Sequence, residues 1–96
     1  MSILSKLTSF PLGQIVLTTG AFDALAIAHQ SPLALLLRHA SGDWGNLCKE
    51  DQAENACALQ QGGRIMSSYT LNSSQTLWII TEADRSVTTL LLPLEY

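Results

Sequence analysis

Charged residues are scarce in this sequence. Only 14% of its 96 residues are charged and 47% are hydrophobic, whereas about a quarter of a typical soluble domain is charged. The five Lys and Arg residues are scattered, and the formal net charge is −3. Because binding to nucleic-acid phosphates depends on clustered basic residues, nucleic acid is not expected as a partner. A surface with so few charges instead favours a homo-oligomer or contact with another protein.

Cysteine is also rare, and the sequence has no zinc-binding spacing. Cys48 and Cys57 fall within one predicted helix, where a rise of about 1.5 Å per residue places their Cα atoms roughly 13 Å apart, beyond disulfide reach. There is no CxxC motif and no Cys/His quartet. We therefore predict two reduced cysteines that pack as small apolar side chains, and neither a metal nor another cofactor.

Long apolar runs are missing as well. The run at residues 33–37 is far shorter than the roughly 20 residues of a membrane-spanning helix. Lys6 interrupts the first apolar segment, unlike the core of a signal peptide. A cytoplasmic protein without a membrane partner is therefore expected. The length predicts a single domain over residues 12–96, preceded by an N-terminal arm over residues 1–11.

Local patterns predict an α+β fold in the order β-α-α-α-β-β-β. The expected strands cover residues 12–18, 64–70, 76–82 and 87–92, and the expected helices cover residues 21–30, 32–40 and 47–61. Ser31-Pro32 is a helix-start pair, and Gly62-Gly63 ends the third helix. We expect the helices to pack on a mainly antiparallel sheet whose last three strands form a meander.

Two polar residues are predicted to lie on apolar helix faces. Asn55 is near the middle of the more apolar face of the third helix. Because a buried amide needs hydrogen-bond partners, we expect it to bind backbone groups of a neighbouring loop; ligand binding is the alternative. His29 ends an apolar stripe on the first helix and is expected at the edge of the core.

Two polar groups are candidate binding sites. The first is Arg38-His39 with Asp43-Trp44, and the second is the last hairpin turn with Arg64 beside it. The predicted binding residues are Asp43, Trp44, Arg64, Glu82, Asp84, Arg85 and Ser86. Strand pairing places the second group near the end of the third helix, so we expect the two groups at opposite ends of the sheet.

Each polar group also has a structural interpretation. Asp43 could bind turn or helix-terminal amides while Trp44 packs beneath the turn. Arg64, Glu82 and Arg85 could form an ion-pair cluster on the hairpin.

The common catalytic motifs are absent: there is no phosphate-binding loop, GxGxxG, HExxH or GxSxG. No catalytic residue is therefore assigned. A small hydrolase or nuclease acting through Arg38, His39 and Asp43 remains an alternative, because active sites can be assembled from scattered residues.

The third predicted strand is apolar on both faces. Side chains alternate along a strand, so Leu77 and Ile79 face one way, and Trp78 and Ile80 the other. Three short helices are expected to cover only one face of the sheet. We therefore predict an apolar interface patch of Trp78, Ile80 and Leu91 on the other face. The alternative is that the N-terminal arm covers this patch.

Short motifs throughout the chain belong to one recognisable pattern. They are Arg38-His39, GDWG at residues 42–45, Glu50-Asp51, Asn55, Gly63-Arg64, Ser67, Tyr69, WIITEADRS at residues 78–86, Thr88-Thr89, residues 91–93 and Glu95-Tyr96. This pattern resembles a family of small bacterial proteins described as plasmid-related, and it covers nearly everything after residue 12. The resemblance implies a bacterial origin and a link to mobile elements, and it brings no activity or cofactor.

The leading hypothesis is a non-catalytic interaction or accessory protein of bacterial mobile elements, expected to self-associate. An inhibitor of a host defence system is an alternative that depends on the resemblance alone.

Overall fold

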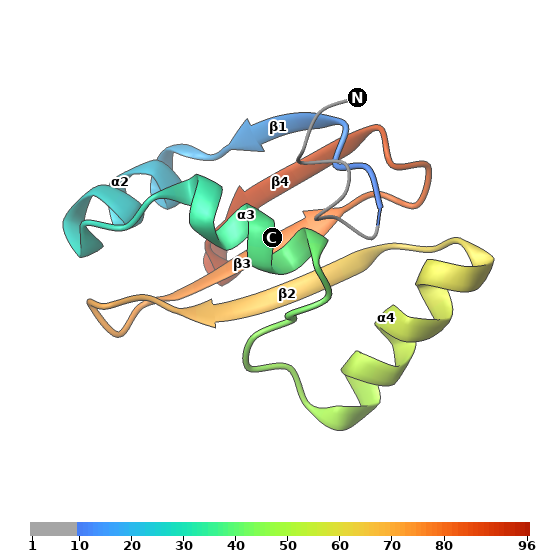
Figure 1. Cartoon of the computed structure of the whole chain (residues 1–96). Coiled ribbons are helices and arrows are strands. Elements are labelled where there is room, and N and C mark those ends of the chain that lie inside the picture. The colour runs from blue at the N-terminus through green and yellow to red at the C-terminus, as the bar shows by residue number, and fades with distance from the viewer. Residues whose placement is uncertain (1–9) are drawn as a thin grey trace.

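The computed structural model describes residues 10–96, in which helices pack with a four-stranded mixed sheet (Figure 1). The elements are β1 (Gln14–Leu17), α2 (Thr19–Ala28), α3 (Pro32–Ala40), α4 (Lys49–Gln61), β2 (Ile65–Thr70), β3 (Thr76–Thr81), β4 (Val87–Leu91) and the 3-10 turn η1 (Pro93–Glu95). The predicted α+β class and element order are confirmed. Of the predicted N-terminal arm, residues 1–9 lie outside the described residues.

The sheet has the strand order β1-β4-β3-β2. Strands β2, β3 and β4 form the predicted antiparallel meander, and β1 pairs with β4 in parallel. Because side chains alternate along each strand, Leu77 and Ile79 belong to the inner face, while Trp78 and Ile80 belong to the outer face.

Local capping explains where the first two helices begin. The Thr18 side chain accepts a hydrogen bond from Ala21 N at 3.1 Å, and the Ser31 side chain accepts one from Leu33 N at 3.2 Å. Helix α2 ends at His29, which adopts a left-handed backbone with a φ of 54°. The His29 side chain is exposed, so its predicted place at the core edge is wrong, because the helix stops before this residue joins the apolar stripe.

Among residues 10–96, no single helix is long and apolar enough to cross a membrane. Helices α2 and α3 together pass that test of length and composition, but they are bent by 107° at the break between them.

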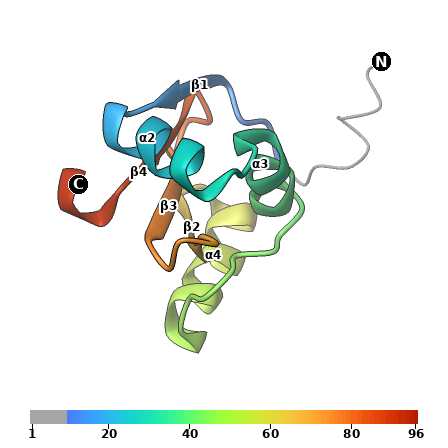
Figure 2. The same ribbon diagram turned by 90° about the vertical axis from the view of Figure 1, so that its left-hand side faces the viewer.

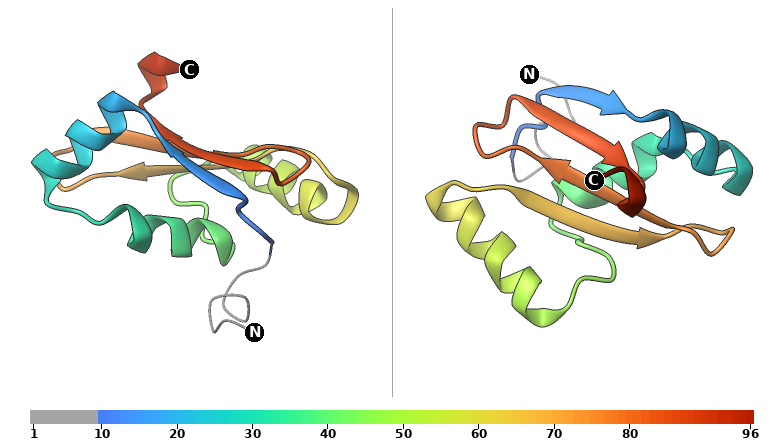
Figure 3. Two further views of the ribbon diagram at one scale, coloured as in Figure 1. Left: turned by 90° about the horizontal axis from the view of Figure 1, so that it is seen from above. Right: turned by 180° about the vertical axis from the view of Figure 1, so that it is seen from behind.

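Helices α2 and α3 build the core against the inner face of the sheet. Figure 3 (left) shows α3 on one side of the sheet and the C-terminal turn on the other. The main core cluster is formed by Ala21, Ala24, Leu25, Ala28, Leu35, Leu36, Tyr69, Leu71, Leu77, Ile79 and Leu90. Each large apolar side chain buried here stabilises the fold by about 1.5–3 kcal/mol.

Helix α4 lies beside β2, away from α2 and α3 (Figure 2). Its Asn55 amide donates to Met66 O at 2.7 Å and accepts from Met66 N at 3.1 Å. The predicted backbone bonding of Asn55 is thus confirmed, with a strand rather than a loop as its partner.

Because α4 buries only a narrow stripe, Cys48 and Cys57 are exposed; they are free thiols, as predicted, but do not pack in the core.

The outer face of the sheet is covered differently from the expectation. Ile80 and Leu91 are only 4% and 6% exposed, so these two residues of the predicted patch are not open to solvent. The C-terminal segment lies over this face (Figure 3, right), and the ring of Tyr96 is 5.8 Å from that of the half-buried Trp78. Phe10, the only buried residue described from the predicted arm, packs on the inner side against Ile65.

Candidate functional site

His39 is fully buried between α3 and the inner face of the sheet. Its Nδ1 is 2.5 Å from Ser67 Oγ, and its Nε2 is 2.9 Å from Thr81 Oγ1. Thr81 Oγ1 is 2.7 Å from Thr88 Oγ1, and the Thr88 hydroxyl donates to Leu12 O at 2.6 Å. Side-chain alternation along the strands places the hydroxyl residues Ser67, Thr81 and Thr88 on the inner face. This alternation is the sequence signal that could have indicated the network.

The Leu12 carbonyl oxygen at the end of this chain of hydrogen bonds fixes which group donates in each bond. A carbonyl oxygen only accepts, so Thr88 donates to Leu12 and accepts from Thr81. Thr81 must then accept from His39 Nε2–H, which leaves Nδ1 to accept from Ser67. Burial lowers the His39 pKa to about 4, so the imidazole is neutral near pH 7, with one donor and one acceptor as the chain requires.

Ser67 and His39 resemble a nucleophile with its base, since the serine donates its proton to the imidazole. However, Ser67, His39 and Thr81 are each 0% exposed. A substrate cannot contact these atoms without local opening of the core, so the arrangement satisfies buried polar groups and links α3 to three strands.

Arg38 in the last turn of α3 forms an ion pair with Asp43 in the loop that follows. Arg38 Nε is 2.6 Å from Asp43 Oδ2, and Asp43 Oδ1 accepts from Gly45 N at 3.2 Å. The guanidinium lies 4.7 Å from the centre of the Tyr69 ring, and the Tyr69 hydroxyl donates to Asp43 O at 2.7 Å. The hydrogen bond from Arg38 lowers the pKa of Asp43, which therefore stays ionised and binds the turn amide as predicted.

Phe10 brings the two predicted polar groups closer together than expected. Its ring is 6.3 Å from that of Trp44, and the Arg85 guanidinium lies 5.6 Å from its centre. The expected separation at opposite ends of the sheet is therefore wrong. The physical reason is that α4 flanks β2 instead of crossing the sheet, and residues 44–46 run along β2, where Ser68 N donates to Trp44 O at 3.1 Å.

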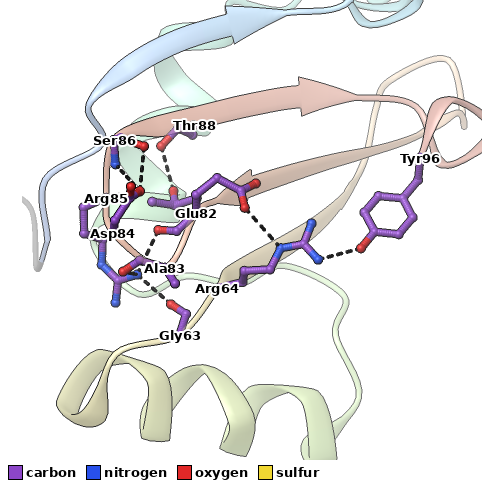
Figure 4. Close-up of polar contacts among 10 residues, drawn as sticks. Gly63, Arg64, Glu82, Ala83, Asp84, Arg85, Ser86, Thr88 and Tyr96 are labelled. Carbon is purple, nitrogen blue, oxygen red and sulfur yellow. Dashed lines mark hydrogen bonds and ion pairs between the residues drawn. The ribbon is translucent and has the colours of Figure 1, made fainter.

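Arg85 fastens the last hairpin turn to the end of α4 (Figure 4). Its guanidinium donates to the backbone oxygens of Ala58, Gly63, Glu82 and Ala83 at 2.6–3.2 Å. It has no described ion pair with the Glu82 carboxylate, so the expected three-residue ion-pair cluster does not include Arg85. In the same turn, Asp84 Oδ1 accepts from Ser86 N and Oγ at 3.0 and 2.6 Å, which lowers the pKa of Asp84.

Arg64 contacts the C-terminal segment near the outer face. Its Nε is 3.6 Å from Glu82 Oε1, which confirms that part of the expected cluster. Its Nη1 donates to the Tyr96 hydroxyl at 2.6 Å, as Figure 4 shows, and the guanidinium lies 5.3 Å from the centre of the Tyr96 ring.

A groove of about 270 Å³ lies between α4 and the outer face of the sheet. Its lining residues are Leu47, Asp51, Glu54, Asn55, Arg64, Met66, Ile80 and Tyr96. No local sequence pattern predicts this groove, because it depends on the position of α4 beside β2. Among the described residues, no group of three or more His, Cys, Asp and Glu side chains could hold a metal ion.

Comparison of the chain with protein families, characterised proteins and solved structures finds no match.

Proposed function

We propose that this chain is a non-catalytic interaction protein, an accessory factor of bacterial mobile elements that self-associates through the outer face of its sheet. The observation that carries the proposal is the exposure of large apolar side chains in the segment lying on that face. Leu94 is 97% exposed and Tyr96 is 68% exposed, and the Tyr96 ring is 5.8 Å from that of the half-buried Trp78. Contiguous exposed apolar patches often mark interaction sites in soluble domains.

Two-fold symmetry makes this surface more effective. In a symmetric dimer the same patch of one copy meets that of the other. Leu94 and Tyr96 of both copies are therefore buried in one interface. Full burial of a leucine is worth about 1.5–3 kcal/mol, before the cost of association is subtracted. Among residues 10–96, the main helices α2 and α3 pack on the other face of the sheet, and the C-terminal segment lies over this one (Figure 3), so a second copy can approach that segment without displacing α2 or α3.

The condition of the catalytic candidates supports a non-catalytic role. His39 is 0% exposed, and both of its ring nitrogens have hydroxyl partners. Arg38 and Asp43 pair with each other rather than with His39. The hydrolase or nuclease alternative would need all three residues to turn toward one substrate.

Light scattering tests the proposal with two charge-introducing variants. Leu94→Glu should convert a dimer into a folded monomer, because the carboxylate would be buried in the interface. Ile27→Glu is the matched control, since Ile27 is 67% exposed on α2, outside the outer face. It should leave the dimer intact.

Circular dichroism would confirm that both variants fold. A wild-type protein that stays monomeric at high micromolar concentration would contradict self-association. A dimer disrupted by Ile27→Glu but not by Leu94→Glu would move the interface to α2.

A further inference from the structure

The groove beside α4 has an apolar floor between fixed walls. Met66 and Ile80 belong to adjacent strands and are paired with each other in the sheet register. Asn55 holds α4 against this floor by its two hydrogen bonds to the Met66 backbone. The groove is therefore part of the folded structure and needs no rearrangement to form.

The size of the groove favours a peptide over a drug-sized molecule. Its volume of about 270 Å³ lies just under the range of about 300–1,000 Å³ typical of small-molecule pockets. One apolar side chain of a peptide fills such a space, while its neighbours in the peptide contact the rim.

The charge around the groove is negative. Asp51 and Glu54 line it from exposed positions on α4, and among residues 10–96 neither has an ion-pair partner. Arg64 lines the groove too, but it is paired with Glu82 and bound to the Tyr96 hydroxyl. The groove is thus lined by two carboxylates and by one guanidinium that is already paired with Glu82, and a cationic occupant complements this imbalance.

We propose that this groove binds a basic segment of another protein, in which one apolar side chain enters the groove and flanking Lys or Arg side chains meet Asp51 and Glu54. The inference rests on the proposed interaction role of the outer face, and it names the chemistry of a second partner there. A second copy fits less well, because the chain has few cations and a net charge of −3.

A titration followed by ¹⁵N NMR tests the groove. The probe is a peptide with a central leucine between lysines in a serine background, and its twin carries glutamate in place of each lysine. We expect shifts at Glu54, Met66 and Ile80 with the lysine peptide alone, weakened by added salt. Each carboxylate should contribute as a surface ion pair does, so Asp51→Asn and Glu54→Gln should each weaken binding by about two- to fivefold.

The chain offers a matched control for charge. Glu50 is an exposed residue next to Asp51 in the first turn of α4, and it does not line the groove. Glu50→Gln should therefore leave the peptide affinity unchanged. Glu54→Lys should shift the preference toward the glutamate peptide. Equal binding of both peptides to the wild type, no binding at millimolar peptide, or equal effects of Glu50→Gln and Glu54→Gln would overturn the inference.

The same titration is repeated with the Leu94→Glu variant, while light scattering reports the oligomeric state. If the wild type self-associates but does not bind the lysine peptide, the groove proposal alone is refuted. If the wild type binds the lysine peptide but stays monomeric, the self-association proposal alone is refuted.

Discussion

Protonation of the buried His39 should contribute strongly to the loss of stability as pH falls below neutrality. Burial lowers its pKa to about 4 in the folded chain, against an ordinary value of 6.5. Above pH 6.5 the folded and unfolded chains both carry a neutral imidazole, and this residue then adds no pH dependence. As pH falls below 6.5, the unfolded chain takes up the proton first, so stability is lost down to about pH 4.

The size of this effect follows from the two pKa values. Each pH unit within the window costs about 1.4 kcal/mol, so the fall from pH 7.5 to pH 4.5 should remove about 2.5 kcal/mol through His39 alone. That is a large part of the roughly 5–15 kcal/mol by which domains are stable. In urea it corresponds to a midpoint lower by roughly 1–2 M.

The assay compares urea unfolding of the wild type and His39→Gln at both pH values. Glutamine keeps a donor and an acceptor but does not titrate in this range. Carboxylates with lowered pKa, such as Asp43 and Glu95, also lose their contribution as pH falls through their folded pKa values, but they are common to both proteins. His39→Gln should therefore lose about 2.5 kcal/mol less than the wild type between the two pH values.

The control for this experiment is His29→Asn. His29 is exposed at the end of α2, and asparagine tolerates the left-handed backbone there. This variant removes a histidine outside the buried network, so the contribution of His39 to the pH profile should remain. Parallel profiles for the wild type and His39→Gln would refute the account of the buried network.

Two further predictions concern the hairpin turn and the cysteines. Arg85→Ala should lower the free energy of unfolding in urea by about 2–3 kcal/mol, because it leaves backbone oxygens at the end of α4 without a charged donor. The folded variant should still form the dimer. An unchanged unfolding midpoint would contradict this structural role of Arg85. Cys48 and Cys57 should both react with a thiol reagent in the native protein because both are exposed, and elemental analysis should find no stoichiometric zinc; protection of both thiols until unfolding would contradict their exposure.

Local signals predicted the elements well. The Ser31-Pro32 pair predicted the start of α3 at Pro32, and Gly62-Gly63 predicted the end of α4 at Gln61. Alternation in the last three strands predicted the meander. These features depend on residues close together in the sequence, where capping and side-chain periodicity act directly.

Long-range contacts explain what the sequence could not predict. The Glu95 carboxylate accepts from the Thr18 hydroxyl at 2.6 Å and from Gly20 N at 3.2 Å, contacts that join the end of the chain to the start of α2. They place Tyr96 over Trp78 and change which apolar residues remain exposed. Neither partner carries a local signal for the other, so the covered patch was not foreseen.

The most direct test of self-association through the outer face is an isotope-filtered nuclear Overhauser experiment on a mixture of labelled and unlabelled protein. We predict contacts between copies at the Leu94 methyl groups and the Tyr96 ring. Contacts confined to Phe22 and Ile27 of α2, or none in a sample that light scattering shows to be dimeric, would contradict the proposed interface.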